Sequence, residues 1–242
     1  MKILSWNIMQ GGGKRSGEIV AAIRRHGPDV IALTEITAGS VERLVRSLKS
    51  DGWGEAFTTD PRGREYGICV LSRTPMRQLA SQNEMPCGGL RWLEVELPAH
   101  GFTLGVVYIL PRAGKERPLK ERDWDALLKA AKLRKERPYL FMGDWNTGRH
   151  RVDEVGSVVP CSDKFVDLGA SGWIDVWRNF HGERREFTWY SRMRGGVLGN
   201  GFRLDHAFSS APLAPRLRGC RYSHAEREAG SSDHSVMLVE VE

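Results

Sequence analysis

The sequence predicts an α/β fold, a four-layer sandwich in which two packed, mostly antiparallel sheets are flanked by helices. Two observations lead to this prediction: the many short strand-like runs and the small number of helical segments between them. Short apolar runs typical of strands are interspersed with a few segments of helical spacing. Many strands with few helices indicate two sheets that bury their faces against each other and against helices. No internal repeat and no linker rich in Pro, Gly or Ser divides the 242 residues, so we expect residues 1–242 to form a single domain.

The first half of the chain contains most of the predicted strands. Lys2–Asn7 suits a short strand, and Ser16 can cap a helix that Gly27 and Pro28 end. The apolar run 30–33 predicts a buried strand. A second amphipathic helix follows, because apolar residues recur at helical spacing at Val41, Leu44, Val45 and Leu48. Further strand-like runs come close together at 67–71, 91–97 and 102–110.

The second half begins with a helix, predicted by the spacing of Trp124, Leu127, Leu128 and Ala131 and ended by Pro138. The apolar run 139–142 stops at Gly143 and Asp144. The segment 145–200 is loop-rich, with a short helix after Ser162. Four glycines predict an irregular loop at 195–201. The runs 207–209 and 235–241 predict the last strands.

Composition narrows the classes of protein. The formal charge is +6, from 36 basic and 30 acidic residues, and a basic excess suits a polyanionic partner. The four cysteines are scattered without a CxxC pair, so neither a zinc site nor a disulfide framework is indicated. The N-terminus lacks the apolar run of a signal peptide, and no stretch approaches the roughly 20 apolar residues of a membrane span, so we expect a cytoplasmic location.

Polar residues stand where apolar runs stop or start. They are Asn7, Glu35 and Asp144, which follow three runs, and Asp205, Asp233 and His234, which precede two others. The end of one antiparallel strand and the start of its neighbour share an edge, so these side chains can lie along one rim of the sheets. Four carboxylates grouped with one histidine repel one another unless a cation or protons compensate. Oxygen ligands of this kind suit Mg²⁺ or Mn²⁺ rather than zinc.

Eight segments occur in an order and spacing that resemble the endonuclease/exonuclease/phosphatase superfamily. They are SWNI (5–8), LTEI (33–36), GICVLSR (67–73), VYILP (107–111), GDWN (143–146), FTWYS (187–191), RLDH (203–206) and SSDH (231–234). The superfamily includes exonuclease III-type abasic-site endonucleases, pancreatic-type deoxyribonucleases, inositol polyphosphate 5-phosphatases and neutral sphingomyelinases. The ordered set GDWN, RLDH and SSDH is highly specific, and the resemblance covers nearly the whole chain. It implies a phosphoric ester hydrolase that depends on Mg²⁺ or Mn²⁺.

The resemblance also implies a role for each polar residue. Glu35 would bind the metal, Asn7 would ligate it or orient Glu35, and Asp233 would be an outer or second ligand. His234 would contact the scissile phosphate, either as a catalytic acid or base or as an electrostatic group. Asp205 would hold that histidine, since such a pair fixes the imidazole tautomer.

The remaining members of the site are implied in the same way. Asp144 would orient or deprotonate the attacking water, Asn146 would donate to the developing phosphorane oxygens, and Tyr108 would lie near the phosphate.

The substrate-binding residues are the least regular part of the resemblance. The asparagine usual after the tyrosine is missing, and Arg112 is the candidate to replace it, while His150 is the candidate for a histidine usual after GDWN. The basic stretch 112–122 suggests a solvated loop and helix start or, alternatively, a segment that tracks a nucleic-acid backbone. Trp189, Phe202 and Leu204 match the walls of a pocket for a base-free or flipped-out nucleotide; alternatively, they pack the rim of the site.

Three functions remain open from the sequence. The first is a DNA endonuclease or 3′ exonuclease, including an abasic-site enzyme, with DNA as partner. The second is a phosphatase or phosphodiesterase acting on a small phosphorylated substrate, such as a phosphoinositide or nucleotide. The third is a non-catalytic nucleic-acid-binding relative, which a self-repelling carboxylate cluster disfavours.

Overall fold

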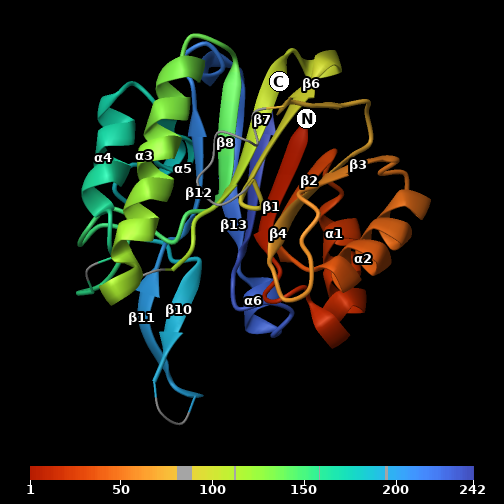
Figure 1. Cartoon of the computed structure of the whole chain (residues 1–242), viewed down its shortest axis with the longest axis horizontal. Coiled ribbons are helices and arrows are strands. Elements are labelled where there is room, and N and C mark those ends of the chain that lie inside the picture. Colours follow the sequence, from red (N-terminus) through yellow and green to blue (C-terminus); the bar gives the residue numbers. More distant parts are fainter. Residues whose placement is uncertain (81–88, 112, 158, 194–195) are drawn as a thin grey trace.

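Two six-stranded sheets form the centre of the computed structural model, which describes residues 1–80, 89–111, 113–157, 159–193 and 196–242 (Figure 1). The first sheet has the order β13-β14-β1-β2-β4-β3. Its strands are β1 (Lys2–Asn7), β2 (Val30–Ile36), β3 (Glu55–Thr58), β4 (Gly67–Ser72), β13 (Leu217–Ser223) and β14 (Val236–Val241). The second sheet has the order β5-β6-β7-β8-β12-β9. Its strands are β5 (Arg77–Gln78), β6 (Trp92–Leu97), β7 (Phe102–Tyr108), β8 (Tyr139–Asp144), β9 (Ile174–Asp175) and β12 (Asp205–Ser209).

Each sheet contains one parallel pair near its centre. β1 runs parallel to β2, and β7 runs parallel to β8. The other strand pairings described within these two sheets are antiparallel, which confirms the predicted character of the sheets. Carboxyl ends of parallel strands meet at one edge, so the β7–β8 pair sets Tyr108 beside Asp144 and the β1–β2 pair sets Asn7 beside Thr34.

Helices cover the outer face of each sheet (Figure 1). α1 (Ser16–His26) and α2 (Ala38–Ser50) pack on the first sheet, while α3 (Arg117–Arg134) and α4 (Ser162–Ala170) pack on the second. The predicted four-layer sandwich is therefore confirmed. The shorter pieces are α5 (Val176–His181), α6 (Ala225–Glu228) and 3₁₀ turns at Gly13–Arg15, Pro98–His100, Gly114–Glu116 and Ala214–Arg216.

The core follows from the two-residue period of the strands. In β2, Val30 and Ala32 belong to the cluster between the sheets, whereas Ile31 and Leu33 belong to the cluster beneath α1 and α2. Both sets are fully buried, and a fully buried aliphatic side chain contributes roughly 1.5–3 kcal/mol. A shift of one residue in pairing would exchange the two faces, so burial on both sides fixes the register that places the strand ends.

The prediction of an irregular loop at 195–201 is wrong for residues 198–201, which belong to a strand. Residues Leu198–Phe202 form β11, which pairs with β10 (Trp189–Arg192) in a hairpin that projects from one end of the molecule (Figure 1). Close packing explains one of its glycines: a Cβ on Gly201 would stand 2.4 Å from Cδ2 of Phe187. The glycine signal therefore reflected close approach inside a hairpin rather than an irregular chain.

A buried carboxylate, Glu226, links the end of α1 to α6. Its Oε1 accepts hydrogen bonds from Arg25 Nη2 at 2.6 Å and His26 Nε2 at 2.9 Å. Its Oε2 accepts one from Ser223 Oγ at 2.7 Å. Burial would raise the pKa of Glu226, but the hydrogen bonds from His26, Ser223 and Arg25 outweigh it and lower that pKa to about 2.

Because this pKa is depressed in the folded protein, the stabilisation is complete above the ordinary glutamate pKa of about 4.3 and is lost as the pH falls from there toward 2. We predict that Glu226→Gln lowers the free energy of unfolding by about 3 kcal/mol near neutral pH. The gap to wild type should shrink by about pH 3. Urea unfolding of both proteins across this range measures it, and a gap that does not change with pH would contradict the prediction.

Candidate active site

Five of the predicted polar residues stand at strand ends along one rim of the two sheets. Asn7 ends β1, Glu35 lies near the end of β2, and Tyr108 and Asp144 end β7 and β8. Asp205 begins β12 and pairs directly with Asp144. Strand register therefore brings together residues that are far apart in the sequence.

Glu35 lies at an irregularity in β2. The pairing with β4 shifts between Thr34 and Ile36, and Glu35 has φ 58°, a left-handed conformation rare outside glycine. Its Oε2 accepts the backbone N–H of Gln10 at 2.7 Å, and its Oε1 accepts the Tyr108 hydroxyl at 3.0 Å. Strain of this kind gathers at functional sites, where it re-aims a side chain.

Asn7 connects the two halves of the site. Its Nδ2 donates to Oε1 of Glu35 at 3.1 Å and to Oδ2 of Asp144 at 2.8 Å, and its Oδ1 accepts the backbone N–H of Met9 at 2.9 Å. The amide oxygen is thus already engaged by the chain. Of the two roles that the sequence left open for Asn7, this geometry favours orienting Glu35 over ligating a metal.

Asp144 is fully buried and depends on the glycine before it. Gly143 has φ 142°, and a Cβ there would stand 2.0 Å from the carbonyl oxygen of Val107, so no other residue fits this position. Burial raises the pKa of Asp144 to about 7, although His234 opposes the shift. Its Oδ1 accepts the backbone N–H of Asn146 at 3.0 Å.

The amide of Asn146 is engaged as well. Its Nδ2 donates to Ile109 O at 2.9 Å and to Asp144 Oδ2 at 3.0 Å, so donation to a substrate would exchange one of these bonds.

His234 and Asp205 form the pair that the sequence predicts. Nδ1 of His234 lies 2.9 Å from Oδ2 of Asp205, and Nε2 lies 3.9 Å from Oδ2 of Asp144. Burial alone would lower the pKa of His234, but Asp205 and Asp144 together raise it to about 10. Thr188 Oγ1 accepts the backbone N–H of Asp205 at 3.3 Å and so fixes the start of β12.

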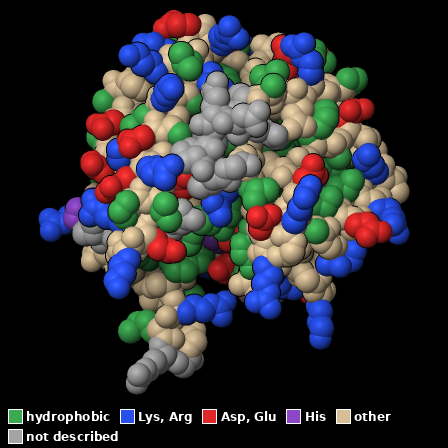
Figure 2. All heavy atoms as spheres, in the orientation of Figure 1, with side chains coloured by type: hydrophobic (Ala, Val, Ile, Leu, Met, Phe, Trp, Pro, Cys, Tyr) green, Lys and Arg blue, Asp and Glu red, His purple; other side chains and the backbone are tan. Residues whose placement is uncertain are grey.

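A pocket of about 330 Å³ opens over these residues. Its polar part includes Glu35, Lys120, Asp144, Asn146, Asp233 and His234. Its apolar lining includes Trp189, Phe202 and Leu204, with the Trp189 and Phe202 rings 5.6 Å apart. The three residues that the sequence suggested as pocket walls therefore all line this pocket. In Figure 2 a hollow above the projecting hairpin shows acidic and histidine side chains at its base.

Two further substrate contacts are expected from the sequence, His150 and Arg112. Nδ1 of His150 lies 2.6 Å from Oε1 of Glu154, an i,i+4 pair, and the described pocket residues do not include His150. Arg112 lies outside the described residues.

Lys120 is a residue of the pocket that the sequence did not reveal. It lies on α3, in the stretch interpreted as solvated, yet its side chain is buried and lines the pocket. Its Nζ donates to the carbonyl of Asn146 at 2.5 Å, and burial lowers its pKa to about 8. The available signal was its position four residues before Trp124, on the apolar face of the helix.

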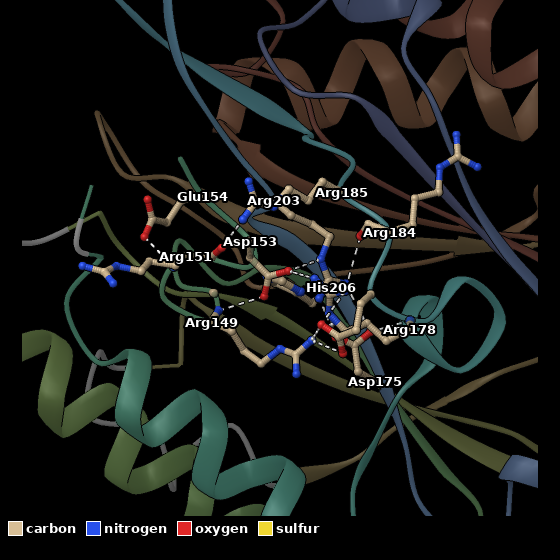
Figure 3. Close-up of polar contacts among 12 residues, drawn as sticks. Arg149, Arg151, Asp153, Glu154, Asp175, Arg178, Arg184, Arg185, Arg203 and His206 are labelled. Atoms are coloured by element: carbon tan, nitrogen blue, oxygen red, sulfur yellow. Dashed lines mark hydrogen bonds and ion pairs between the residues drawn. The ribbon is translucent and has the colours of Figure 1, made fainter. Parts of the chain in front are cut away.

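Arg203 was also missed, and it anchors the loop behind the catalytic strands (Figure 3). Its Nε donates to Oδ1 of Asp153 at 2.8 Å and its Nη2 to Oδ2 of Asp175 at 2.6 Å, while Arg178 also pairs with Asp153. Asp153 in turn accepts the backbone N–H of Arg149 at 2.8 Å. The arginine just before Leu204 and Asp205 therefore fixes the loop that follows GDWN.

His206 has a structural role that the sequence did not reveal: it holds the backbone next to Asn146. Its Nε2 lies 2.8 Å from the carbonyl oxygen of Thr147, next to Asn146. Burial lowers its pKa to about 4, so the ring is neutral and Nε2–H donates to that carbonyl.

A family model described as the Endonuclease/Exonuclease/phosphatase family matches residues 4–234. The chain belongs to this family. A Streptococcus pneumoniae exodeoxyribonuclease is 26% identical, with 100% of both chains covered. A Dictyostelium discoideum DNA-(apurinic or apyrimidinic site) endonuclease is 23% identical over 100% of this chain and 71% of the relative.

Solved structures share the fold of the family. An AP endonuclease from Archaeoglobus fulgidus superposes with a TM-score of 0.86 at 18% identity, covering 100% of this chain and 99% of the other. A 3′ phosphatase from Neisseria, solved with a product DNA hairpin, gives a TM-score of 0.83 at 20% identity, covering 100% of this chain and 99% of the other.

Within the described residues, no helix is both long and apolar enough to cross a membrane.

Members of this family depend on a divalent metal, and the donors present fit one. Asp144, Asp205 and His234 offer ligand atoms within 4.8 Å of one another. The Asp205–His234 hydrogen bond already engages two of them. Glu35 and Asp233 line the same pocket, and their carboxylate oxygens suit a hard cation. Glu35 is joined to this group through the Asn7 amide, which donates to Glu35 and to Asp144.

We predict that Mg²⁺ raises the melting temperature of the wild-type protein and that EDTA reverses the rise. Binding to the native state alone contributes about 2.7 kcal/mol at about 100 times the dissociation constant. Glu35→Ala should lose most of this shift, whereas Glu42→Gln on the exposed surface of α2 should keep it. An equal shift in Glu35→Ala would exclude Glu35 as a ligand.

Proposed function

We propose that this protein is an Mg²⁺- or Mn²⁺-dependent phosphodiesterase that acts on DNA, as an abasic-site endonuclease or 3′ exonuclease, with residues 1–242 working as a single domain. One observation supports this most strongly. Three polar side chains line one pocket together with the aromatic residues Trp189 and Phe202. They are Glu35, a metal-binding candidate, the buried Asp144, and His234, which is hydrogen-bonded to Asp205. The names of the relatives, an exodeoxyribonuclease and an abasic-site endonuclease, point to the same substrate.

The proposed chemistry follows from the protonation states and contacts. Asp144, within 3.9 Å of His234 Nε2, would orient the attacking water and accept its proton. His234, whose pKa is raised to about 10, would present a cation to the scissile phosphate while Asp205 fixes its ring. Lys120 would add a second positive charge at the pocket. A cation held at Glu35, and at Asp233 as an outer or second ligand, would neutralise charge on the phosphate and the leaving oxygen.

The metal-site carboxylate Glu35 is held by Tyr108 as well as Asn7. The pKa of the Tyr108 hydroxyl is raised above its usual range by burial and by the carboxylates of Glu35 and Asp144. It therefore stays protonated and donates to Glu35. The main role proposed for Tyr108 is therefore to orient Glu35. Its hydroxyl would also lie close to the bound phosphate.

We predict that His234→Ala and Asp144→Ala each lower turnover on duplex DNA by at least about two orders of magnitude. The melting temperature of Asp144→Ala should hold or rise, because the substitution relieves repulsion between Asp144 and Asp205. That of His234→Ala should fall, because the substitution removes the cation that lies against both carboxylates. Steady-state cleavage of a labelled duplex in Mg²⁺, together with thermal unfolding, measures both. Purified Asp144→Ala with near-wild-type turnover would rule out its proposed role.

The wall of Trp189, Phe202 and Leu204 supports a substrate with an exposed sugar. An enzyme that acts at a damaged site extrudes the nucleotide at a cost of a few kcal/mol, least where base pairing is already lost. Aromatic rings can then pack against a sugar that lacks its base. Basic side chains spread over the visible face around the hollow provide contacts for a phosphate backbone (Figure 2).

We predict that the wild-type enzyme cleaves an abasic duplex faster than an otherwise identical intact duplex, and that Trp189→Ala and Phe202→Ala reduce this preference. The assay compares kcat/KM on the two duplexes for all three proteins. A panel of small phosphoesters serves as the control. Equal rates on both duplexes would exclude the pocket function, and preferential release of phosphate from the small panel would identify a phosphatase instead.

A further inference from the structure

Trp189 makes two different kinds of contact at the base of the β10–β11 hairpin. Its ring packs beside Phe202, with ring centroids 5.6 Å apart, and both residues line the pocket. Its indole Nε1–H donates to Oδ2 of Asp233 at 3.0 Å. A single side chain therefore joins the aromatic wall to the acidic side of the site.

The indole hydrogen bond orients the carboxylate of Asp233, whereas other contacts hold the backbone of Asp233. The loop around it is fixed to β1, because Ser232 Oγ donates to Asn7 O at 2.6 Å and His234 N donates to Ser232 Oγ at 3.2 Å. The Asp233 side chain is only partly buried. Among the described residues, the Trp189 indole is its one hydrogen-bond donor. The direction in which Asp233 points is thus set mainly by Trp189.

We propose that Trp189 is a positioning residue for Asp233 as well as a pocket wall, and that it couples occupation of the pocket to metal binding at Asp233. The proposal rests on the function proposed above, in which Asp233 is an outer or second metal ligand. It assigns the indole N–H a role that the aromatic ring alone cannot perform.

The physical basis is the ordering of two partly exposed side chains by one hydrogen bond. A carboxylate that is already oriented loses less freedom when it binds a cation, and partners of this kind typically change metal affinity 10- to 100-fold. A cation at Asp233 in turn restrains the indole. A sugar that packs on the restrained ring then binds with a smaller loss of conformational entropy. Coupling of binding free energies is reciprocal, so occupation of the pocket strengthens metal binding by the same factor.

The test is Mn²⁺ affinity without DNA, measured from free Mn²⁺ by electron paramagnetic resonance. It compares wild type, Trp189→Phe, Asp233→Ala and the double variant. Trp189→Phe keeps an aromatic ring and removes the N–H, so it should bind Mn²⁺ about tenfold more weakly. If Trp189 acts through Asp233, the substitution should cause no further loss when Asp233 is already alanine.

The matched control is Phe202→Leu, which removes the ring beside Trp189 and leaves the indole N–H in place. It should bind Mn²⁺ like wild type while binding an abasic duplex more weakly. Together with Trp189→Phe, it separates the wall from the hydrogen bond.

Two results would overturn the coupling alone, in an enzyme that still cleaves DNA. One is an equal Mn²⁺ affinity in wild type and Trp189→Phe. The other is a loss that persists at full size in the Asp233→Ala background. A wild-type protein that neither binds Mn²⁺ nor cleaves DNA would overturn the proposed function together with this inference.

Discussion

The arrangement of this protein depends on the burial of two carboxylates opposite each other on neighbouring strands. Asp144 and Asp205 are direct partners in the β8–β12 register, and both are nearly inaccessible to solvent. Two buried negative charges so placed repel each other strongly unless positive or hydrogen-bonding groups compensate. His234 lies against both, and Asn7 donates to Asp144. The strand that carries each partner must therefore be held in register, and burial on both faces of the sheets does this.

The residues around this pair are held in conformations that an ordinary chain avoids. Met9, Gln10, Glu35 and Asn146 all have positive φ without being glycine. Such positions cost roughly 1–3 kcal/mol each and persist only where their surroundings enforce them. Here the enforcing contacts are visible: Glu35 Oε2 accepts the Gln10 N–H, while Lys120 holds the Asn146 carbonyl. Arg203 and His206 fix the same loop from behind. Stability from the core thus supports strain at the site.

The sequence predicted the features that local pattern controls. β1 matches its expected bounds, and the polar residues at strand ends converge because each apolar run stops where a sheet ends. α1 starts close to the expected position, but Ser16 is its first helical residue and Arg15, not Ser16, is its N-cap. Features that depend on distant partners were missed. β13 alternates arginine with buried Leu217, Cys220 and Tyr222, so it lacks a continuous apolar run, and only pairing with β14 makes it a strand. His150 stays a candidate substrate contact, with Nδ1 2.6 Å from Oε1 of Glu154.

Asp144 and His234 show how the same buried environment can set two roles. Burial disfavours the charged form of both groups, and this effect wins at Asp144, whose pKa rises to about 7. At His234 the neighbouring carboxylates win, and its pKa rises to about 10. The pair therefore separates into a carboxyl group that can take up a proton near neutral pH and an imidazolium that keeps its own. Two such groups would suit the base and the electrostatic partner of the proposed mechanism. Neither value could be read from GDWN or SSDH alone, because burial in the folded protein raises the first and the carboxylates of Asp205 and Asp144 raise the second.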